Sequence, residues 1–242
     1  MRFICLAAGK GTRFKQLGTY LQKCMYPIGG IPFLQFSMEN LIESAGFDPD
    51  EDSITLVVGH FGEQVRSYFT DEFRNTRITY VDQAGAAGTG HAVLKAYEAE
   101  PFREPAAVWL ADTYISADLF HEIRQSREEA VLTIARHVCE RKHRERVSVS
   151  PDGLRITRAW QGTSDFVDIG LWKVPPSVIG SMLSHKTDEH RYLPVVENAI
   201  EDGLRVRALY ADKWLHLGGT EPSVTENLKS LTSALINRVK DS

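Results

Sequence analysis

Short apolar runs alternate with segments of helical periodicity along the first half of the chain. Apolar residues spaced by three and four positions over 33–45 and 62–73 predict two amphipathic helices. The apolar runs that we expect to form buried strands are 3–6, 54–59, 77–81 and 106–112. Strands that alternate with helices in this way form parallel sheets covered on both faces. The pattern therefore predicts an α/β fold with a doubly wound, mostly parallel sheet.

The pattern changes after residue 130. Apolar and polar residues alternate over 131–136, and two further short runs, 146–150 and 154–160, flank the turn signal Pro151-Asp152-Gly153. These runs predict a small β-hairpin insertion. The segment 222–239 has helical periodicity, and we expect a C-terminal helix there that packs on the sheet. A single domain over residues 1–242 accommodates all of these elements.

Composition narrows the class of protein. The chain has 242 residues, a formal net charge of −4 and 43% hydrophobic residues, which is typical of a soluble globular protein and favours neither nucleic-acid nor membrane-surface binding. Its three cysteines are far apart, so we expect no disulfide framework and a reducing compartment. Because no signal peptide or membrane-length apolar run is apparent, we expect a cytoplasmic protein.

The stretch from Leu6 to Arg13 follows the first predicted strand and contains Gly9 and Gly11. Glycines let backbone N–H groups approach an anion, and Arg13 and Lys23 add positive charge beside that loop. This combination predicts a site for the phosphates of a nucleoside triphosphate. The spacing does not fit a P-loop, and the third glycine of a dinucleotide fingerprint is missing; an ordinary strand-to-helix turn is the alternative.

The segment 82–92 is rich in glycine and alanine and contains Gln83. Small residues suit a flat nucleobase lying against the backbone, and a glutamine amide can hydrogen-bond a base edge. Close packing between helix and sheet is the alternative explanation.

Asp112 ends the predicted strand 106–112. A carboxylate at the end of a buried strand needs solvent, a partner or a metal, and Mg²⁺ commonly binds one or two carboxylates together with substrate phosphates. The sequence therefore predicts that Asp112 is a metal ligand. An N-cap of the following helix is the alternative.

The segments 6–13 and 23–32 together resemble the signature of the sugar-phosphate nucleotidyltransferases, and the resemblance extends to about residue 228. It implies a Rossmann-like nucleotidyltransferase fold with a nucleotide-binding half over about 1–125 and an acceptor-binding half over about 126–228. It also implies that Arg13 and Lys23 are catalytic and that Asp112 binds Mg²⁺, with Mn²⁺ as the alternative ion. The nucleotide-binding residues implied by the resemblance are Leu6, Ala8, Gly9, Gly11, Thr12, Gln83, Gly88 and Thr89.

Two later segments resemble the family with departures. Asp168 and Gly170 are similar to an Asn-x-Gly strand that contacts the acceptor sugar, and Arg158 is our candidate for a missing acceptor lysine. The segment 213–222 resembles one in which an aspartate is the second metal ligand, but this chain has His216. Imidazole is a poor Mg²⁺ ligand, so we expect a one-carboxylate Mg²⁺ site, with a changed metal preference or weakened catalysis as alternatives.

The expected activity joins a nucleoside triphosphate, with UTP or CTP favoured, to a sugar 1-phosphate and releases pyrophosphate. One alternative is a cytidylyltransferase that acts on a phospho-alcohol such as phosphocholine or glycerol phosphate. The alternative from another class is a non-catalytic regulatory subunit that binds nucleotide-sugars. We expect small-molecule partners, no nucleic acid and no membrane, and we leave a homo-oligomer open. A zinc site at His137, Cys139 and His143 is disfavoured by its spacing.

Overall fold

The structure is a computed structural model that describes residues 1–14, 16–85, 88–136, 146–184, 191–212, 214–218, 229–230 and 232–235, without the side chains of Arg13, Leu183 and Ser184. The zinc alternative and most of the predicted helix 222–239 lie outside these residues. Where that helix is described, the buried Leu235 packs against Phe33 and Phe36.

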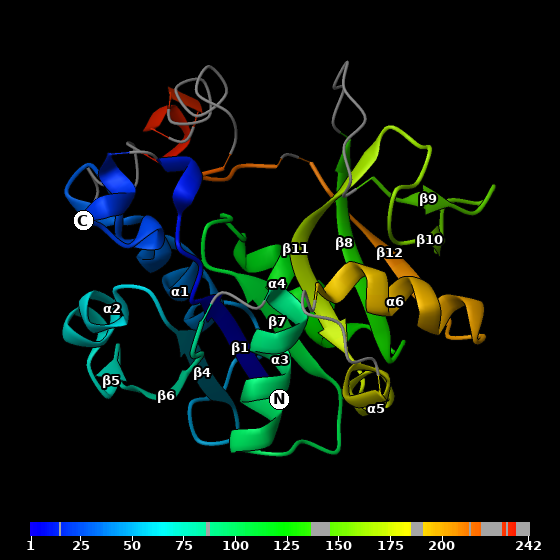
Figure 1. Ribbon diagram of the computed structural model, residues 1–242, viewed down its shortest axis with the longest axis horizontal. Helices are drawn as coiled ribbons and strands as arrows, with labels where there is room; N and C mark the ends of the chain where they lie inside the picture. The colour runs from blue at the N-terminus through cyan, green and yellow to red at the C-terminus, as the bar shows by residue number, and fades with distance from the viewer. Residues whose placement is uncertain are drawn as a thin grey trace.

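One large sheet runs through the described part of the chain (Figure 1). The order of its ten described strands is β5 (Glu72–Phe73), β6 (Thr76–Asp82), β4 (Ser53–Val58), β1 (Arg2–Ala7), β7 (Ala106–Leu110), β11 (Phe166–Val174), β8 (Ala130–Arg136), β12 (Val206–Ala211), β10 (Arg155–Arg158) and β9 (Ser148–Val149). The described helices are α1 (Phe33–Ile42), α2 (Gly62–Phe69), α3 (Thr89–Ala99), α4 (Ala117–Gln125), α5 (Pro176–Ser184) and α6 (Tyr192–Glu201).

Most strands of this sheet point in one direction. β1 pairs in parallel with both β4 and β7, and β8 pairs in parallel with β12. β11 runs antiparallel between β7 and β8 and joins the two parallel blocks. The predicted doubly wound, mostly parallel α/β fold is confirmed. The predicted hairpin is confirmed as well, because β9 and β10 pair antiparallel at the edge of the sheet.

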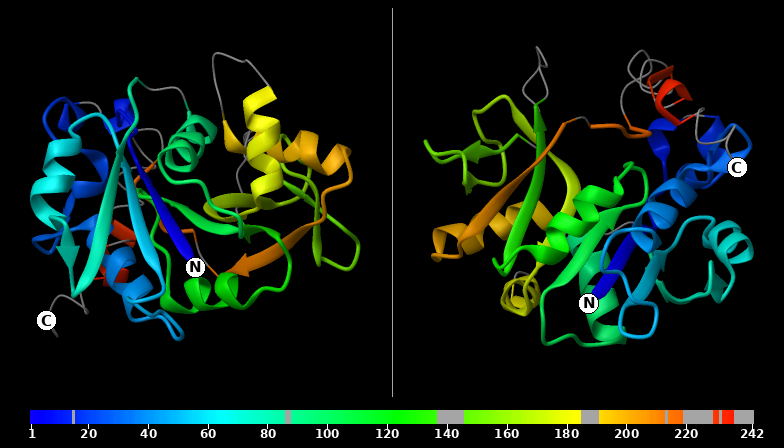
Figure 2. Two further views of the ribbon diagram at one scale, coloured as in Figure 1. Left: turned by 90° about the horizontal axis from the view of Figure 1, so that it is seen from below. Right: turned by 180° about the vertical axis from the view of Figure 1, so that it is seen from behind.

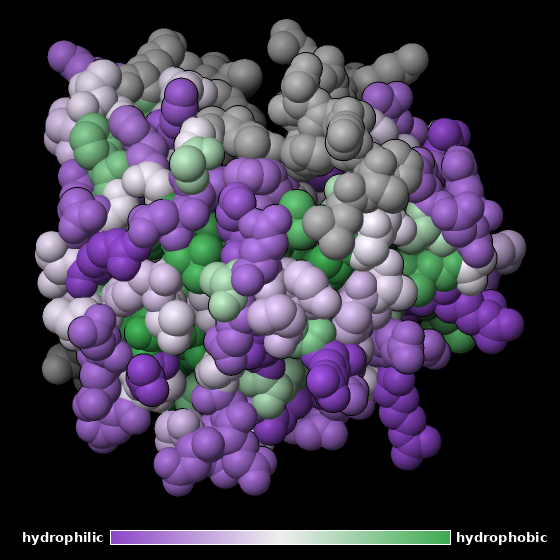
Figure 3. Space-filling model, turned by 60° about the horizontal axis from the view of Figure 1, so that its bottom comes forward, coloured by the Kyte–Doolittle hydropathy of each residue, from purple (hydrophilic) through white to green (hydrophobic). Residues whose placement is uncertain are grey.

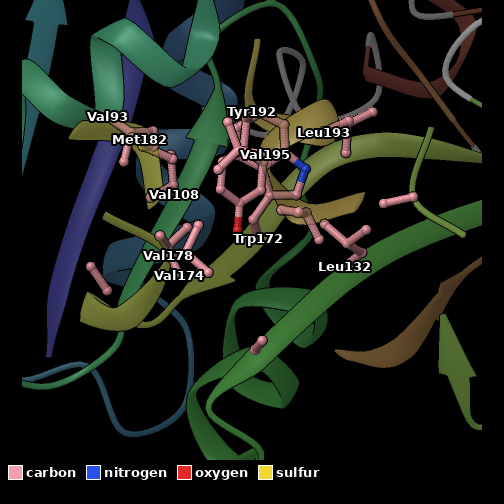
Figure 4. Close-up of a cluster of buried hydrophobic side chains, with 14 of the residues drawn as sticks. Val93, Val108, Leu132, Trp172, Val174, Val178, Met182, Tyr192, Leu193 and Val195 are labelled. Atoms are coloured by element: carbon pink, nitrogen blue, oxygen red, sulfur yellow. The ribbon is translucent and has the colours of Figure 1, made fainter. Parts of the chain in front are cut away.

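Two hydrophobic cores lie on opposite faces of the sheet, because side chains alternate along each strand. Ile4 and Leu6 of β1 belong to the core covered by α3, α5 and α6. Phe3 and Cys5 belong to the core covered by α1, α2 and α4. Figure 2 shows helices on both sides of the strands, and Figure 4 shows part of the first core around Trp172.

Two local predictions were wrong. The helix expected over 62–73 ends at Phe69, because Thr70 has a positive φ of 51° and the chain then forms β5 against β6. The strand expected to alternate over 131–136 is buried on both faces, since β8 lies between β11 and β12 and meets both cores.

The surface is mainly polar on the side drawn in Figure 3, with hydrophobic side chains in separate small areas. Within the described ranges, no helix is long and apolar enough to span a bilayer.

Candidate active site

The glycine loop follows the carboxyl end of β1. Gly9 and Lys10 are exposed, and Gly11 has a left-handed φ of 59° before a short 3₁₀ helix, η1 (Thr12–Phe14). A Cβ on Gly11 would lie 3.3 Å from Cβ of Lys23. The glycine therefore provides the backbone conformation of the turn and the close approach of the loop to Lys23. The catalytic role of Arg13 stays a prediction, because its side chain lies outside the described part.

The side chain of Gln22 hydrogen-bonds to the backbone of this loop. Its Nε2 donates to the carbonyl oxygens of Ala7, at 2.5 Å, and Gly9, at 3.3 Å, and its Oε1 accepts from the N–H of Cys24 at 2.9 Å. The side chain is buried, so it links β1, the loop and the segment that carries Lys23. The sequence gives no sign of this role of Gln22 other than its position directly before Lys23.

Lys23 and Asp112 form an ion pair in the structure. Lys23 begins the 3₁₀ helix η3 (Lys23–Met25), whereas Asp112 follows β7, so the pair joins segments that are far apart in sequence. The N-cap alternative for Asp112 is wrong, because Ser116 caps α4 by accepting the N–H of Leu119 at 3.3 Å. Burial and the nearby charge of Asp112 together raise the pKa of the Cys24 thiol to about 12. The thiol therefore stays protonated at neutral pH and is unreactive.

The segment 214–218 lies beside this ion pair. His216 forms a bridge with Thr113, and the N–H of Leu217 donates to the carbonyl oxygen of Asp112 at 2.8 Å. The His216 ring stacks on Trp214, with a centroid separation of 3.9 Å. A Cβ on Gly218 would lie 3.6 Å from Nζ of Lys23. The fold therefore brings Lys23, Asp112 and the segment that carries His216 together.

Hydrogen bonding fixes the proton position on neutral His216. The N–H of Gly218 donates to Nδ1 at 2.9 Å, so Nδ1 presents a lone pair and Nε2 carries the proton. That tautomer favours a hydrogen-bond donor over a metal ligand at Nε2. Over the described residues, no group of three or more His, Cys, Asp or Glu side chains is arranged to hold a metal ion. Asp112, with one third of its side chain exposed, suits a Mg²⁺ ion that also binds substrate phosphates.

A cavity of about 390 Å³ opens next to the loop. Ala8 and Lys10 line one side, and the segment from Asp82 to Gly85 lines the other. Gly59 lies between them, where a Cβ would come within 3.0 Å of Cβ of Ala8 and 3.1 Å of the carbonyl oxygen of Gln83. A side chain at Gly59 would therefore force the walls apart.

Gln83 is 7% exposed, and its amide is held by the following segment. Nε2 lies 3.0 Å from the carbonyl oxygen of Gly88 and 2.9 Å from Nδ1 of His91. Thr89 begins α3, and its hydroxyl accepts the N–H of Tyr192 from α6 at 3.0 Å. Of the predicted base-binding residues, Gln83 therefore lines the cavity, while Thr89 connects two helices.

A family comparison agrees with this arrangement. The model of the MobA-like NTP transferase domain matches residues 3–201. The chain belongs to this family. The resemblance predicted from the glycine loop is confirmed, and the protein is a nucleotidyltransferase.

Individual relatives of this nucleotidyltransferase include sugar-nucleotide enzymes. It is 25% identical to the UTP–glucose-1-phosphate uridylyltransferase AglF of Haloferax volcanii over 88% of this chain and 89% of that protein. It is 30% identical to the bifunctional protein GlmU of a Ruegeria species over 85% of this chain, but it spans only 47% of that longer protein.

Solved structures support the fold. A UDP-glucose pyrophosphorylase complexed with UDP-glucose superposes with a TM-score of 0.78 at 19% identity, over 98% of each chain. The inositol-1-phosphate CTP transferase of T. maritima gives a TM-score of 0.77 at 17% identity, over all of this chain and 96% of that one.

The predicted acceptor-binding residues of the nucleotidyltransferase lie on two strands, Asp168 and Gly170 on β11 and Arg158 on β10. Asp168 is buried in β11, and its Oδ1 accepts Nε1–H of Trp172 at 2.7 Å. Trp172 stacks on Tyr192 (Figure 4), whose pKa is raised by burial and by the Asp168 charge. Arg158 instead pairs with Glu197 of α6 at 2.9 Å. The acceptor roles of Asp168, Gly170 and Arg158 stay predictions.

Proposed function

We propose that this nucleotidyltransferase joins UTP or CTP to a sugar 1-phosphate and releases pyrophosphate. The observation that carries the proposal is the Lys23–Asp112 pair, which places a cation and a carboxylate directly beside a glycine loop. The uridylyltransferase relative that aligns along most of the chain supports the same reaction class.

In the proposed reaction, an oxygen of the acceptor phosphate attacks the α-phosphorus of the triphosphate. A phosphorus–oxygen bond forms there, the bond from the α-phosphorus to the β-phosphate bridging oxygen breaks, and its electron pair leaves with pyrophosphate. Such a reaction depends on positioning and charge neutralisation more than on covalent work by the protein.

The chain supplies these elements from separate segments. The loop N–H groups between Ala8 and Thr12 would bind phosphate oxygens, and Lys23 would draw the α-phosphate and the acceptor phosphate together. We assign Arg13 to the charge that develops on pyrophosphate. His216 lies in the neighbouring segment, where its backbone pairs with Thr113, next to Asp112.

We assign Asp112 as the carboxylate that would hold Mg²⁺ together with substrate phosphates. When bound, Mg²⁺ neutralises phosphate charge. Because Asp112 pairs with Lys23 in the structure, we expect Lys23 to shift toward the phosphates when the metal binds. A cytoplasmic location, expected from the sequence, belongs to the same proposal.

The decisive experiment measures pyrophosphate release from a panel of nucleoside triphosphates and phosphorylated acceptors with Mg²⁺. The acceptors include hexose and heptose 1-phosphates, phosphocholine and glycerol phosphate. We expect turnover with a sugar 1-phosphate and UTP or CTP. Turnover only with a phospho-alcohol would favour that alternative, and nucleotide-sugar binding without turnover would favour a regulatory subunit.

The matched variants are Asp112→Ala and Asp118→Ala. Asp118 is an exposed carboxylate on the same segment, so its loss should leave the rate unchanged. Losing Asp112 should lower kcat by about 10²–10³-fold or more, because a pre-placed charge at the phosphates is removed. Unchanged kcat in a folded Asp112→Ala protein would refute the metal assignment.

A further inference from the structure

His91 has no role in the mechanism above, yet it contacts the residue proposed to read the base. It lies in the first turn of α3, partly buried, and its Nδ1 is 2.9 Å from Nε2 of Gln83. The carbonyl oxygen of Gly88 lies 3.0 Å from the same nitrogen.

These two contacts determine the orientation of the Gln83 amide. A backbone carbonyl oxygen can only accept a hydrogen bond, so the amide atom next to Gly88 must be the NH₂ group. One N–H bonds this carbonyl and the second points to Nδ1 of His91, which must therefore present a lone pair. His91 is neutral in this arrangement, with its proton on Nε2.

Both amide donors of Gln83 are thus used within the protein. The remaining polar atom of the amide is the carbonyl Oε1, and Gln83 lines the 390 Å³ cavity next to the glycine loop. A ligand that reaches the Gln83 amide would therefore meet a hydrogen-bond acceptor. It would meet a donor if the amide were turned over.

We propose that His91 is a positioning residue for nucleotide specificity, which holds Oε1 of Gln83 toward the cavity so that a pyrimidine with a ring N–H is preferred. The inference rests on the proposed function, since it assumes that the cavity receives the base. In this proposal, N3 of the base lies opposite Oε1, where uracil and thymine carry a hydrogen that they can donate. Cytosine carries a lone pair at N3, which would face the same oxygen unfavourably. The inference therefore selects UTP over CTP.

Without the His91 acceptor, one amide hydrogen loses its partner and the amide can rotate. Rotation presents NH₂ to the cavity, which suits the N3 lone pair of cytosine. One neutral hydrogen bond corresponds to a change of about tenfold in binding. We therefore expect loss of the acceptor to lower the preference for UTP over CTP by about tenfold.

The experiment measures Kd for UTP, CTP, ATP and GTP by titration calorimetry with Mg²⁺ and no acceptor, using the full chain. The variants are His91→Leu and His91→Ala, which both remove the acceptor, and His91→Asn, whose amide oxygen can replace the lone pair of Nδ1. Folding of each variant is checked by circular dichroism, and the two acceptor-free variants substitute for each other if one does not fold.

The expected result is that the unsubstituted protein binds UTP more tightly than CTP, that the Leu or Ala variant loses most of this ratio, and that His91→Asn restores it. A purely structural role would weaken UTP and CTP equally. An unchanged ratio in the acceptor-free variants, or a preference for CTP before substitution, overturns the inference. If the unsubstituted protein binds none of the four triphosphates, the proposed function fails instead.

Discussion

Gly170 lies at a position of the central sheet that has no room for a side chain. It lies in β11 with a φ of 85°, and a Cβ there would come within 2.5 Å of Cδ1 and 2.6 Å of Cγ of Leu110. We predict that Gly170→Ala lowers the free energy of unfolding by about 2–4 kcal/mol, as the sum of left-handed strain and overpacking. Urea denaturation of the ligand-free protein measures this loss.

Gly180 is the matched control for that substitution. It lies exposed in α5, and nothing lies within 4 Å of a Cβ added there. Gly180→Ala should be neutral or stabilising by about 0.5–1 kcal/mol, because alanine favours a helix. Equal destabilisation by the two substitutions would contradict the steric explanation.

Single residues were predictable where their chemistry is unusual for their position. Lys23 and Asp112 were singled out because a phosphate-binding loop needs cations and a buried strand end does not tolerate an unpaired carboxylate. His91 and Gln22 were missed because each acts through a contact with another residue, and such a contact depends on the folded chain. His216 was singled out from the family resemblance, but its proton position depends on the N–H of Gly218, which the sequence does not show.

Asp52 connects the first elements of the chain to α4. Its buried carboxylate accepts from Nη1 of Arg124 at 2.5 Å and from the N–H of Asp48 at 2.9 Å, and it pairs with the N-terminal ammonium. Burial alone would raise the pKa of Asp52, but these partners outweigh it and hold the pKa below its usual value. The charged carboxylate therefore stabilises the junction of β1, β4 and α4.

We predict that Asp52→Asn lowers the free energy of unfolding at pH 7 by about 2–3 kcal/mol. Because the folded pKa lies below the unfolded value of about 3.9, the stabilising contribution is present above that pH and is lost as pH falls through the folded pKa. The difference between Asp52→Asn and the unsubstituted protein should thus shrink below about pH 4.

Chemical denaturation at pH 7, 5 and 3 measures this dependence. Glu51→Gln removes an exposed neighbouring charge and should change stability by less than about 0.5 kcal/mol at each pH. A loss for Asp52→Asn that stays constant down to pH 3 would show that charge is not the cause.

Helices and strands were predictable where the period of the apolar residues and the length of the run indicate the same type of element. The strands of the parallel block and α1 follow from their apolar patterns. The end of α2 does not follow from the apolar pattern, because the apolar residue Phe73 continues the helical period while the backbone turns at Thr70. A positive φ at a threonine has no marker in the sequence.

At the scale of the whole molecule, the order of the strands is what brings the site together. β11 separates β7 from β8, and the segment after β12 returns to Asp112. Helical and strand periods describe only local neighbours, so they could not predict this order. The resemblance to the family supplied the fold class, but no strand order was predicted from it.

The same arrangement predicts how ligands stabilise the protein. Asp112 is already neutralised by Lys23, so a metal ion must compete with an ammonium group unless phosphates draw that group away. We therefore expect Mg²⁺ alone to leave the thermal midpoint almost unchanged. When the UTP concentration is 100 times the Kd for UTP, UTP with Mg²⁺ should stabilise the protein by about 2.7 kcal/mol. For a chain of this size, that corresponds to a rise of roughly 5–11 °C in Tm. Removing the metal with EDTA should reverse part of that rise in the unsubstituted protein and none of it in Asp112→Ala. A large shift with Mg²⁺ alone would mean that the metal binds elsewhere, and the ion pair would then have no part in coupling metal to nucleotide.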